Sequence, residues 1–263
     1  ALVVQRYGTE IIGGSESLCR QVAELLLPHH FVDVLTTCAQ NYMTWKNEYP
    51  EGVEKINGVL VRRFSVERER NVKLFDEFTV KLFAAEHSYL DEHKWLEDQG
   101  PYVPEMLKYI ASHKDDYDIF IFFAYRYYPS IFGLPLVHNK SILIPTAENE
   151  VALILTHTKS LLNLPAAIVY LTNEERVMIN SKSGNGNIET EVIGIGPHVP
   201  EKLNPTRFKE KFRLFFDFVI YVGRVDGSKG CDHLFSYFSQ YKKLHPSNLK
   251  LLLVGPLFMT LPK

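Results

Sequence analysis

The stretch that most constrains the fold of this chain is Tyr221-Val-Gly-Arg-Val-Asp-Gly-Ser-Lys-Gly230. An apolar, β-branched run from Phe218 to Val222 comes before the turn and is typical of a buried parallel strand. Apolar residues at helical spacing follow it, with Ser228 as the expected N-cap residue. Open α/β sheets bind ligands at such strand-to-helix turns, and helix N-termini attract anions. Arg224 and Lys229 add positive charge, so the turn is either a phosphate site or an ordinary turn with two solvated cations.

The remaining sequence alternates apolar strands with amphipathic helices, which predicts a mainly parallel sheet with helices on both faces. The strands are expected at 1–4, 32–37, 59–64, 118–123, 141–144, 167–171 and 191–194. Helices are expected after residue 15, within 65–114 as two helices divided at Gly100-Pro101, and at 151–162.

Three prolines between 197 and 205 indicate an interdomain linker. We therefore predict a domain over 1–198, a linker over 199–216, and the first βαβ unit of a second domain over 217–263. One βαβ unit cannot cover both faces of a parallel sheet, so we expect the second domain to be truncated here. For that reason the 263-residue chain is not expected to be active by itself.

Composition excludes several classes of protein. A formal net charge of -2 argues against a general nucleic-acid binder. Three widely spaced cysteines argue against a disulfide framework and fit a reducing cytoplasm. No apolar run reaches the roughly 18 residues that a membrane span needs. We expect a cytoplasmic protein, at the inner membrane surface if the helices within 65–114 touch lipid.

Several familiar motifs fail. Gly194-Ile-Gly196 begins like a dinucleotide fingerprint, but Pro197 and Pro200 stand where its helix should start. A phosphate loop and a nucleophile elbow are both missing from the sequence. His87 and His93 do not have the spacing of a helical metal site, so no metal ligands are expected.

Four motifs together resemble the retaining glycosyltransferases of family 4. Ile12-Gly-Gly-Ser-Glu16 is similar to the family's first-loop motif, Val192 to Gly196 to the end of its N-terminal domain, and Tyr221–Gly230 and Leu251 to Gly255 to its donor domain. One bacterial subgroup is also similar at Leu35 to Ala39, Trp45, Arg62 to Phe64, Gln99 to Pro101, Tyr127 to Pro129 and Pro145 to Ala147. The resemblance implies the GT-B fold, an α/β fold of two Rossmann-like domains.

The resemblance also implies a reaction: transfer of a sugar from a nucleotide-sugar donor to a glycan or lipid-linked acceptor, with retention and without a metal or other cofactor. Residues implied to bind the donor diphosphate are Gly13, Gly14, Gly223, Arg224, Lys229 and Gly230. Catalytic residues in the first domain are less well matched. Many family members carry a histidine where this chain has Phe123, with Tyr125 just beyond, and only Glu150 remains from the acidic end of a later loop. Tyr125 and Glu150 are the candidates.

Aromatic loops of the first domain are predicted to hold the acceptor, because flat ring faces suit sugar rings. The candidates are Tyr42, Trp45, Trp95, Tyr125 and Tyr127. The alternative is that these rings belong to the core. At the level of function, the alternative to an enzyme is a catalytically inactive glycosyltransferase-like subunit that binds an active partner.

Overall fold

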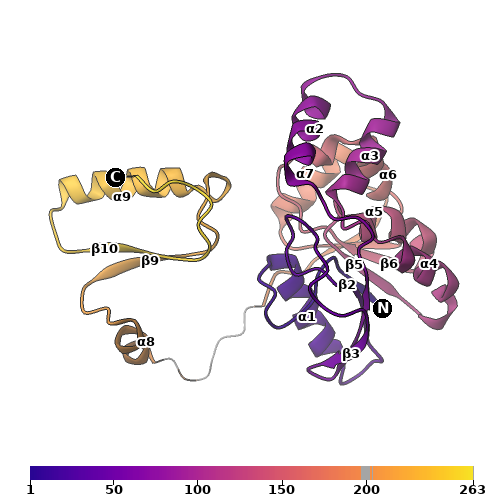
Figure 1. Cartoon of the computed structure of the whole chain (residues 1–263), viewed down its shortest axis with the longest axis horizontal. Coiled ribbons are helices and arrows are strands. Elements are labelled where there is room, and N and C mark those ends of the chain that lie inside the picture. Colours follow the sequence, from indigo (N-terminus) through magenta and orange to yellow (C-terminus); the bar gives the residue numbers. More distant parts are fainter. Residues whose placement is uncertain (197–201, 203, 263) are drawn as a thin grey trace. The chain divides into compact units, whose positions relative to one another are not determined.

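The computed structural model describes residues 1–196, 202 and 204–262 (Figure 1). The chain divides into two compact units, an N-terminal unit Ala1–Gly196 and a C-terminal unit Pro197–Lys263. The boundary predicted at residue 198 lies outside the described residues.

The N-terminal unit is built on an eight-stranded sheet with the order β3-β4-β2-β1-β5-β6-β7-β8. Every neighbouring pair is parallel except β3 and β4, which confirms the expectation of a mainly parallel sheet. The strands are β1 Leu2–Val3, β2 Asp33–Thr37, β3 Gly52–Ile56, β4 Val59–Phe64, β5 Phe120–Phe123, β6 Ser141–Ile144, β7 Ala167–Tyr170 and β8 Glu189–Val192.

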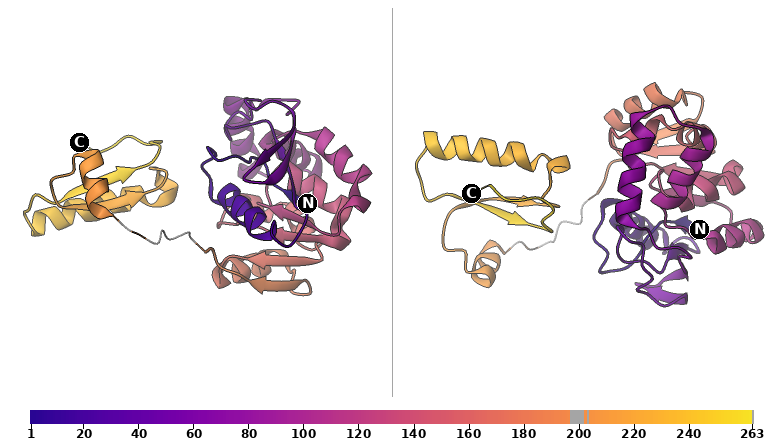
Figure 2. Two further views of the ribbon diagram at one scale, coloured as in Figure 1. Left: turned by 90° about the horizontal axis from the view of Figure 1, so that it is seen from below. Right: turned by 45° about the horizontal axis from the view of Figure 1, so that its top comes forward.

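Helices cover both faces of this sheet, as predicted (Figure 1, Figure 2). They are α1 Gly14–Leu26, α2 Val72–Ala84, α3 Tyr89–Gln99, α4 Pro104–Ser112, α5 Tyr128–Gly133, α6 Thr156–Leu161 and α7 Asn173–Ser183. On one face, α1 buries Leu18 and Ala23 against Val34 of β2. On the other face, α3 and α4 bury Leu96 and Met106 against the strand residues that alternate with those of the first cluster.

The region 65–114 contains three helices, not the two predicted. The break between α2 and α3 comes from Ser88, whose hydroxyl accepts from the Asp91 N–H while the Asp91 carboxylate accepts from the Ser88 N–H, a capping box that starts a new helix. Gly100, with φ 69°, ends α3. The helix predicted at 151–162 is a short 3-10 turn, Val151–Ile154, followed by α6.

The C-terminal unit contains α8 Pro205–Phe212, β9 Phe218–Val222, α9 Cys231–Leu244 and β10 Lys250–Val254. β9 and β10 pair in parallel, with Phe218 opposite Lys250. α8 lies within the segment 199–216 that was predicted to be the linker. Asn204 caps this helix by accepting from the Arg207 N–H. Across the part of the chain that the structure describes, no helix has both the length and the apolar character needed to cross a membrane.

Candidate functional site

The sheet order places a topological switch between β1 and β5. From β1 the chain moves outward to β2 on one side, and it returns to β5 on the other side. Because the strands are parallel, the loops after β1, β2, β5 and β6 all leave the same edge of the sheet. Ligands of open α/β proteins bind at this edge, beside the switch point.

The glycine pair lies at the end of the loop after β1. Gly13 occupies the N-cap position of α1, and no side chain caps the helix there. A Cβ atom added to Gly13 would lie 2.1 Å from the Glu16 carboxylate, whereas one added to Gly14 would meet nothing within 4 Å. A side chain at Gly13 would therefore displace the Glu16 carboxylate, whereas Gly14 leaves open space at the helix N-terminus.

A buried ion pair holds this loop. Arg6 donates from Nε and Nη2 to Glu16 Oε1, at 2.9 and 2.5 Å, and from Nη1 to the Gln40 carbonyl at 2.7 Å. The Arg6 guanidinium also lies 5.3 Å from the centre of the Tyr42 ring. Arg6 was not predicted as a site residue, although a charged residue three positions after a buried strand was a usable signal. The pair ties the glycine loop to the loop after β2.

Tyr125 and Glu150, the two catalytic candidates, are in contact. The Tyr125 hydroxyl donates to Glu150 Oε1 at 2.8 Å, and Arg126 forms an ion pair with the other carboxylate oxygen. Burial raises the pKa of Tyr125, and the neighbouring Glu150 raises it further, so the hydroxyl keeps its proton. The carboxylate is thus held by two donors from the loop after β5, of which Arg126 was missed in the sequence.

Unusual backbone conformations set this geometry. Ala124 and Thr146, at the ends of β5 and β6, have positive φ angles of 63° and 49°. The Ala124 N–H donates to the Ile144 carbonyl and the Tyr125 N–H to the Pro145 carbonyl, which join the two loops. Positive φ at a residue other than glycine costs about 1–2 kcal/mol and is concentrated at functional sites.

A pocket of about 300 Å³, here called the inner pocket, opens beside Glu150. Its lining includes Tyr42, Arg70, Phe75, Trp95, Arg126, Tyr127 and Glu150. Four of these residues were predicted as site residues from the sequence, and they come from four separate segments: Tyr42, Trp95, Tyr127 and Glu150. The roles of half-buried Tyr42 and Tyr127 in acceptor binding stay predictions.

Trp45, Trp95 and Tyr125, three of the residues predicted to bind the acceptor, are buried, and their role in acceptor binding stays a prediction. These side chains are 1%, 5% and 1% exposed. The Trp45 indole N–H donates to the Gln99 carbonyl at 2.8 Å, and that of Trp95 donates to Thr79 Oγ1 at 2.9 Å. Both indoles are core residues with their polar atom satisfied, and only their edges reach a pocket.

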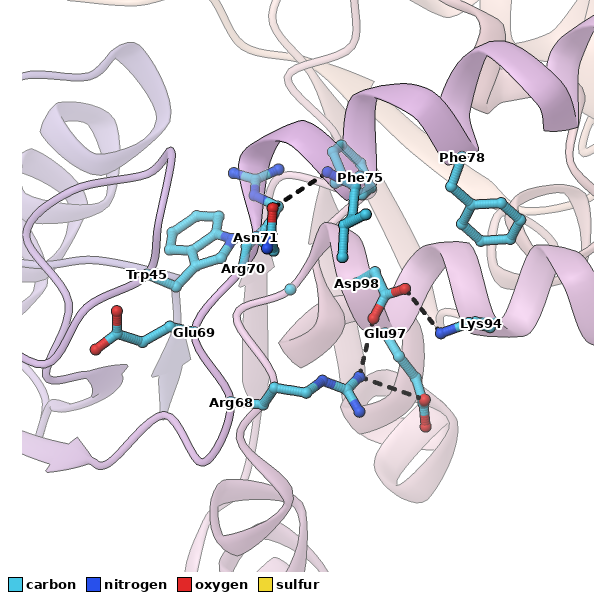
Figure 3. A pocket seen from close by; sticks show the side chains of 12 residues that line it. Trp45, Arg68, Glu69, Arg70, Asn71, Phe75, Phe78, Lys94, Glu97 and Asp98 are labelled. Carbon is cyan, nitrogen blue, oxygen red and sulfur yellow. Dashed lines mark hydrogen bonds and ion pairs between the residues drawn. The ribbon is translucent and has the colours of Figure 1, made fainter.

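A second pocket of about 340 Å³, here called the outer pocket, lies between α2 and α3 (Figure 3). Arg70 and Phe75 line both pockets. Arg70 donates to the carbonyls of Tyr42 and Met43, and its guanidinium lies 4.8 Å from the Phe75 ring centre. Burial lowers the pKa of Arg70 to about 10, so it remains charged at neutral pH. Arg70 and Phe75 thus form a wall between the two pockets, and these hydrogen bonds and this ring contact hold it in place.

In the C-terminal unit, the turn after β9 differs from the prediction in its capping. Asp226, not Ser228, is the capping residue: its carboxylate accepts from the Lys229 N–H at 3.0 Å at the start of the 3-10 turn Gly227–Lys229. Gly230, with φ 72°, then leads into α9. Asp226 also accepts from Arg224 Nε, and the Arg224 guanidinium donates to Ser228 Oγ at 3.1 Å.

Asp226 therefore balances part of the positive charge of this turn. A hydrogen bond from Ser228 lowers the pKa of the Asp226 carboxyl, and Arg224 lowers it further, so the carboxylate stays ionised. The turn is a pre-ordered array that includes the two cationic side chains predicted to bind a diphosphate.

Close backbone packing fixes the start of this turn. Gly223 has φ 150°, and Gly255, just after β10, has φ 148°. A Cβ atom on Gly255 would lie 1.9 Å from the Gly223 carbonyl oxygen. The bonds from the Gly223 N–H to the Val254 carbonyl and from the Val225 N–H to the Pro256 carbonyl flank this contact, each at 2.9 Å. The turn is thus held directly against the end of β10.

Among the residues that the structure describes, no group of three histidine, cysteine, aspartate or glutamate side chains could hold a metal ion.

Comparisons with known proteins give a likeness in structure only. No family model matches the sequence, and no curated protein matches it. Solved structures do match. They include an α,α-trehalose-6-phosphate synthase of Burkholderia multivorans, at 12% identity and TM-score 0.61, over 97% of this chain and 62% of that one.

Two UDP-forming α,α-trehalose-phosphate synthases are also similar, each at 12% identity. The protein of Burkholderia vietnamiensis has TM-score 0.62 and is covered over 63% of its length by 98% of this chain. That of Burkholderia xenovorans, solved with glucose-6-phosphate, has TM-score 0.63 and is covered over 65% by 98% of this chain. The chain spans less than two thirds of these proteins and has their α/β architecture with a mainly parallel sheet, the GT-B fold.

Proposed function

We propose that this chain belongs to a glycosyltransferase that moves a sugar from a nucleotide-sugar donor to a glycan or lipid-linked acceptor, with retention and without a required metal. Membership of family 4 is part of this proposal. The observation that carries it is the ordered Arg224 and Lys229 turn after β9, in a chain with the fold of UDP-forming synthases.

On the donor side, the chemistry needs positive charge where the leaving diphosphate gains negative charge. Arg224 and Lys229 supply it from a turn whose backbone is fixed by Asp226 and by the packing of Gly223. Preordered cations stabilise developing charge without reorganising during the reaction. Gly14, at the N-terminus of α1 where no side chain caps the helix, offers backbone N–H groups of the kind that bind anions.

On the acceptor side, Glu150 is the residue that contacts the acceptor hydroxyl. The Tyr125 hydroxyl and the Arg126 guanidinium fix its carboxylate in the lining of the inner pocket. Because Tyr125 keeps its proton, it acts as a donor that orients Glu150, and it is not a base.

The inactive partner subunit remains the second candidate, and one observation favours it. Phe123, at the position where the resemblance implies a histidine, is 1% exposed in the core, so β5 ends without a titratable group. An inactive subunit would have no need of the turn that carries Arg224 and Lys229, so a substitution in this turn tests both proposals.

The decisive experiment is Lys229→Ala in the full-length enzyme, assayed by transfer of a radiolabelled sugar from nucleotide-sugar. Deleting one preordered donor to a developing anion costs about 2.7–4 kcal/mol, so kcat should fall by about 10²–10³. Stability should change by less than about 0.5 kcal/mol, because Lys229 lies on an exposed turn.

Lys243→Ala is the matched control, since Lys243 is an exposed lysine on α9 outside the turn. Its activity should equal that of the wild type. Unimpaired transfer by Lys229→Ala would refute the role of the turn. If the wild-type protein transfers no sugar from any nucleotide-sugar but binds an active transferase, it is the inactive subunit instead.

A further inference from the structure

The outer pocket has no role in the transfer described above, yet it is built on the same wall as the inner pocket. It lies between the first half of α2 and the second half of α3. Phe75 and Phe78 of α2 and the edge of Trp45 form its apolar side (Figure 3). Charged side chains from the loop before α2 and from α3 form its rim, namely Arg68, Glu69, Lys94, Glu97 and Asp98.

The rim is ordered by ion pairs. Arg68 Nη2 lies 3.1 Å from Asp98 Oδ1 and 3.6 Å from Glu97 Oε2. Lys94 Nζ lies 3.0 Å from Asp98 Oδ2, and its ammonium lies 5.9 Å from the Phe78 ring centre. The Arg68 guanidinium and the Glu97 and Asp98 carboxylates are thus paired at the rim of a pocket that has an aromatic side.

This chemistry selects one class of ligand. Three basic and three acidic residues line the pocket, counting Arg70, so the site has no formal charge with which to attract an anion or a cation. A long apolar chain would strip water from the charged rim, which is unfavourable. A neutral ring with many hydroxyls fits both parts: its C–H face packs on Phe75 and Phe78, and its hydroxyls bond to the rim.

The two pockets adjoin, because Arg70 and Phe75 line both of them. Arg70 is fixed by the Met43 carbonyl at 2.8 Å and by the Gln99 amide oxygen at 3.3 Å. A ligand that extends from Glu150 past Arg70 and Phe75 would therefore reach the outer pocket.

We propose that the outer pocket is a second acceptor subsite, which holds the next sugar ring of a glycan whose terminal ring occupies the inner pocket. The inference rests on the proposed function and names its acceptor: a neutral oligosaccharide chain of at least two rings. The outer ring contributes affinity and leaves the reacting hydroxyl in place beside Glu150.

The test compares two acceptor panels with the full-length enzyme and radiolabelled nucleotide-sugars. One panel contains p-nitrophenyl monosaccharides, and the other contains p-nitrophenyl disaccharides with the same terminal rings. For a terminal sugar that the enzyme accepts, kcat/KM should be at least tenfold higher for the disaccharide than for the monosaccharide. A tenfold ratio corresponds to about 1.4 kcal/mol of transition-state stabilisation.

Two variants isolate the subsite. Phe78→Ala should lower kcat/KM for the disaccharide by about threefold to tenfold and leave the monosaccharide unchanged, since one aromatic contact contributes about 0.5–1.5 kcal/mol. Glu69→Ala, at an exposed rim residue that leaves the fold intact, should act in the same direction. Val80→Ala is the control, because Val80 is a 72% exposed residue of α2 that does not line the pocket.

Each outcome decides. Equal kcat/KM for both panels, or a wild-type preference that neither Phe78→Ala nor Glu69→Ala reduces, overturns the subsite while sugar transfer itself stands. Failure to transfer to either panel overturns the oligosaccharide acceptor and the subsite with it, whereas the proposed sugar transfer is decided separately by Lys229→Ala.

Discussion

Replacing Gly255 with alanine should disrupt the turn that carries Arg224 without touching any charged residue. The new Cβ atom would lie 1.9 Å from the Gly223 carbonyl oxygen and 2.7 Å from its carbonyl carbon. Both are backbone atoms, so no side chain can rotate away and the two strand ends must separate by about 1 Å or more to reach normal contact.

The cost follows from three contributions. Alanine at a φ of 148° is strained by about 1–3 kcal/mol. Separation also weakens the flanking bonds from Gly223 N to Val254 O and from Val225 N to Pro256 O, each with a net contribution of about 0.5–1.5 kcal/mol. We expect the C-terminal unit to lose about 3 kcal/mol of stability.

Hydrogen–deuterium exchange read by mass spectrometry can localise the effect. Peptides covering 218–226 should lose protection, whereas the urea transition followed by tryptophan fluorescence should not move, since Trp45 and Trp95 both lie in the N-terminal unit. Gly230→Ala is the matched control: Gly230 has φ 72° with open space around its Cβ position, so it carries the strain without the clash. It should cost about 1–2 kcal/mol. If both variants lose protection equally, the contact with Gly223 contributes nothing and the reasoning fails.

Two further perturbations probe the N-terminal unit. Burial lowers the pKa of His157, which lies against Glu92 and His93. Below about pH 6.5 the unfolded chain therefore binds a proton that the folded chain does not, and the free energy of unfolding should fall as the pH drops. In urea titrations, His157→Gln should flatten this pH dependence. Tyr125→Phe removes one of the two donors to Glu150 and should lower kcat about tenfold, with KM for the donor unchanged; an unchanged kcat would remove Tyr125 from the site.

Much of the fold could be predicted because buried parallel strands have continuous apolar sequences. Phe120–Phe123 and Ser141–Ile144 were found in this way. β3 was missed because it is an exposed edge strand, with Glu54 and Lys55 in place of an apolar face. α7 was missed because only Glu175 and Ile179 of its residues are buried, which leaves too weak a stripe for a periodicity argument.

The site was predictable where it follows directly from strand ends. Tyr125 and Glu150 come after neighbouring parallel strands, so their approach follows from topology. Their partner Arg126 could have been found by the same argument. The burial of Trp45 and Trp95 could not, because the sequence does not show whether an aromatic ring on a loop or on a mixed-charge helix packs inward or outward.

The central position of β1 has a consequence for how the N-terminal unit folds. Leu2 pairs with Val34 on one side and with Ile121 on the other. The second of these pairings must wait until a long intervening segment, which includes α2, α3 and α4, has been synthesised and brought back. Pairings so distant in sequence slow folding, because the entropy of loop closure is lost before the contact forms. During synthesis, the first strand would therefore have one unpaired edge until β5 leaves the ribosome, and the nascent chain would be most prone to misassociation in that interval.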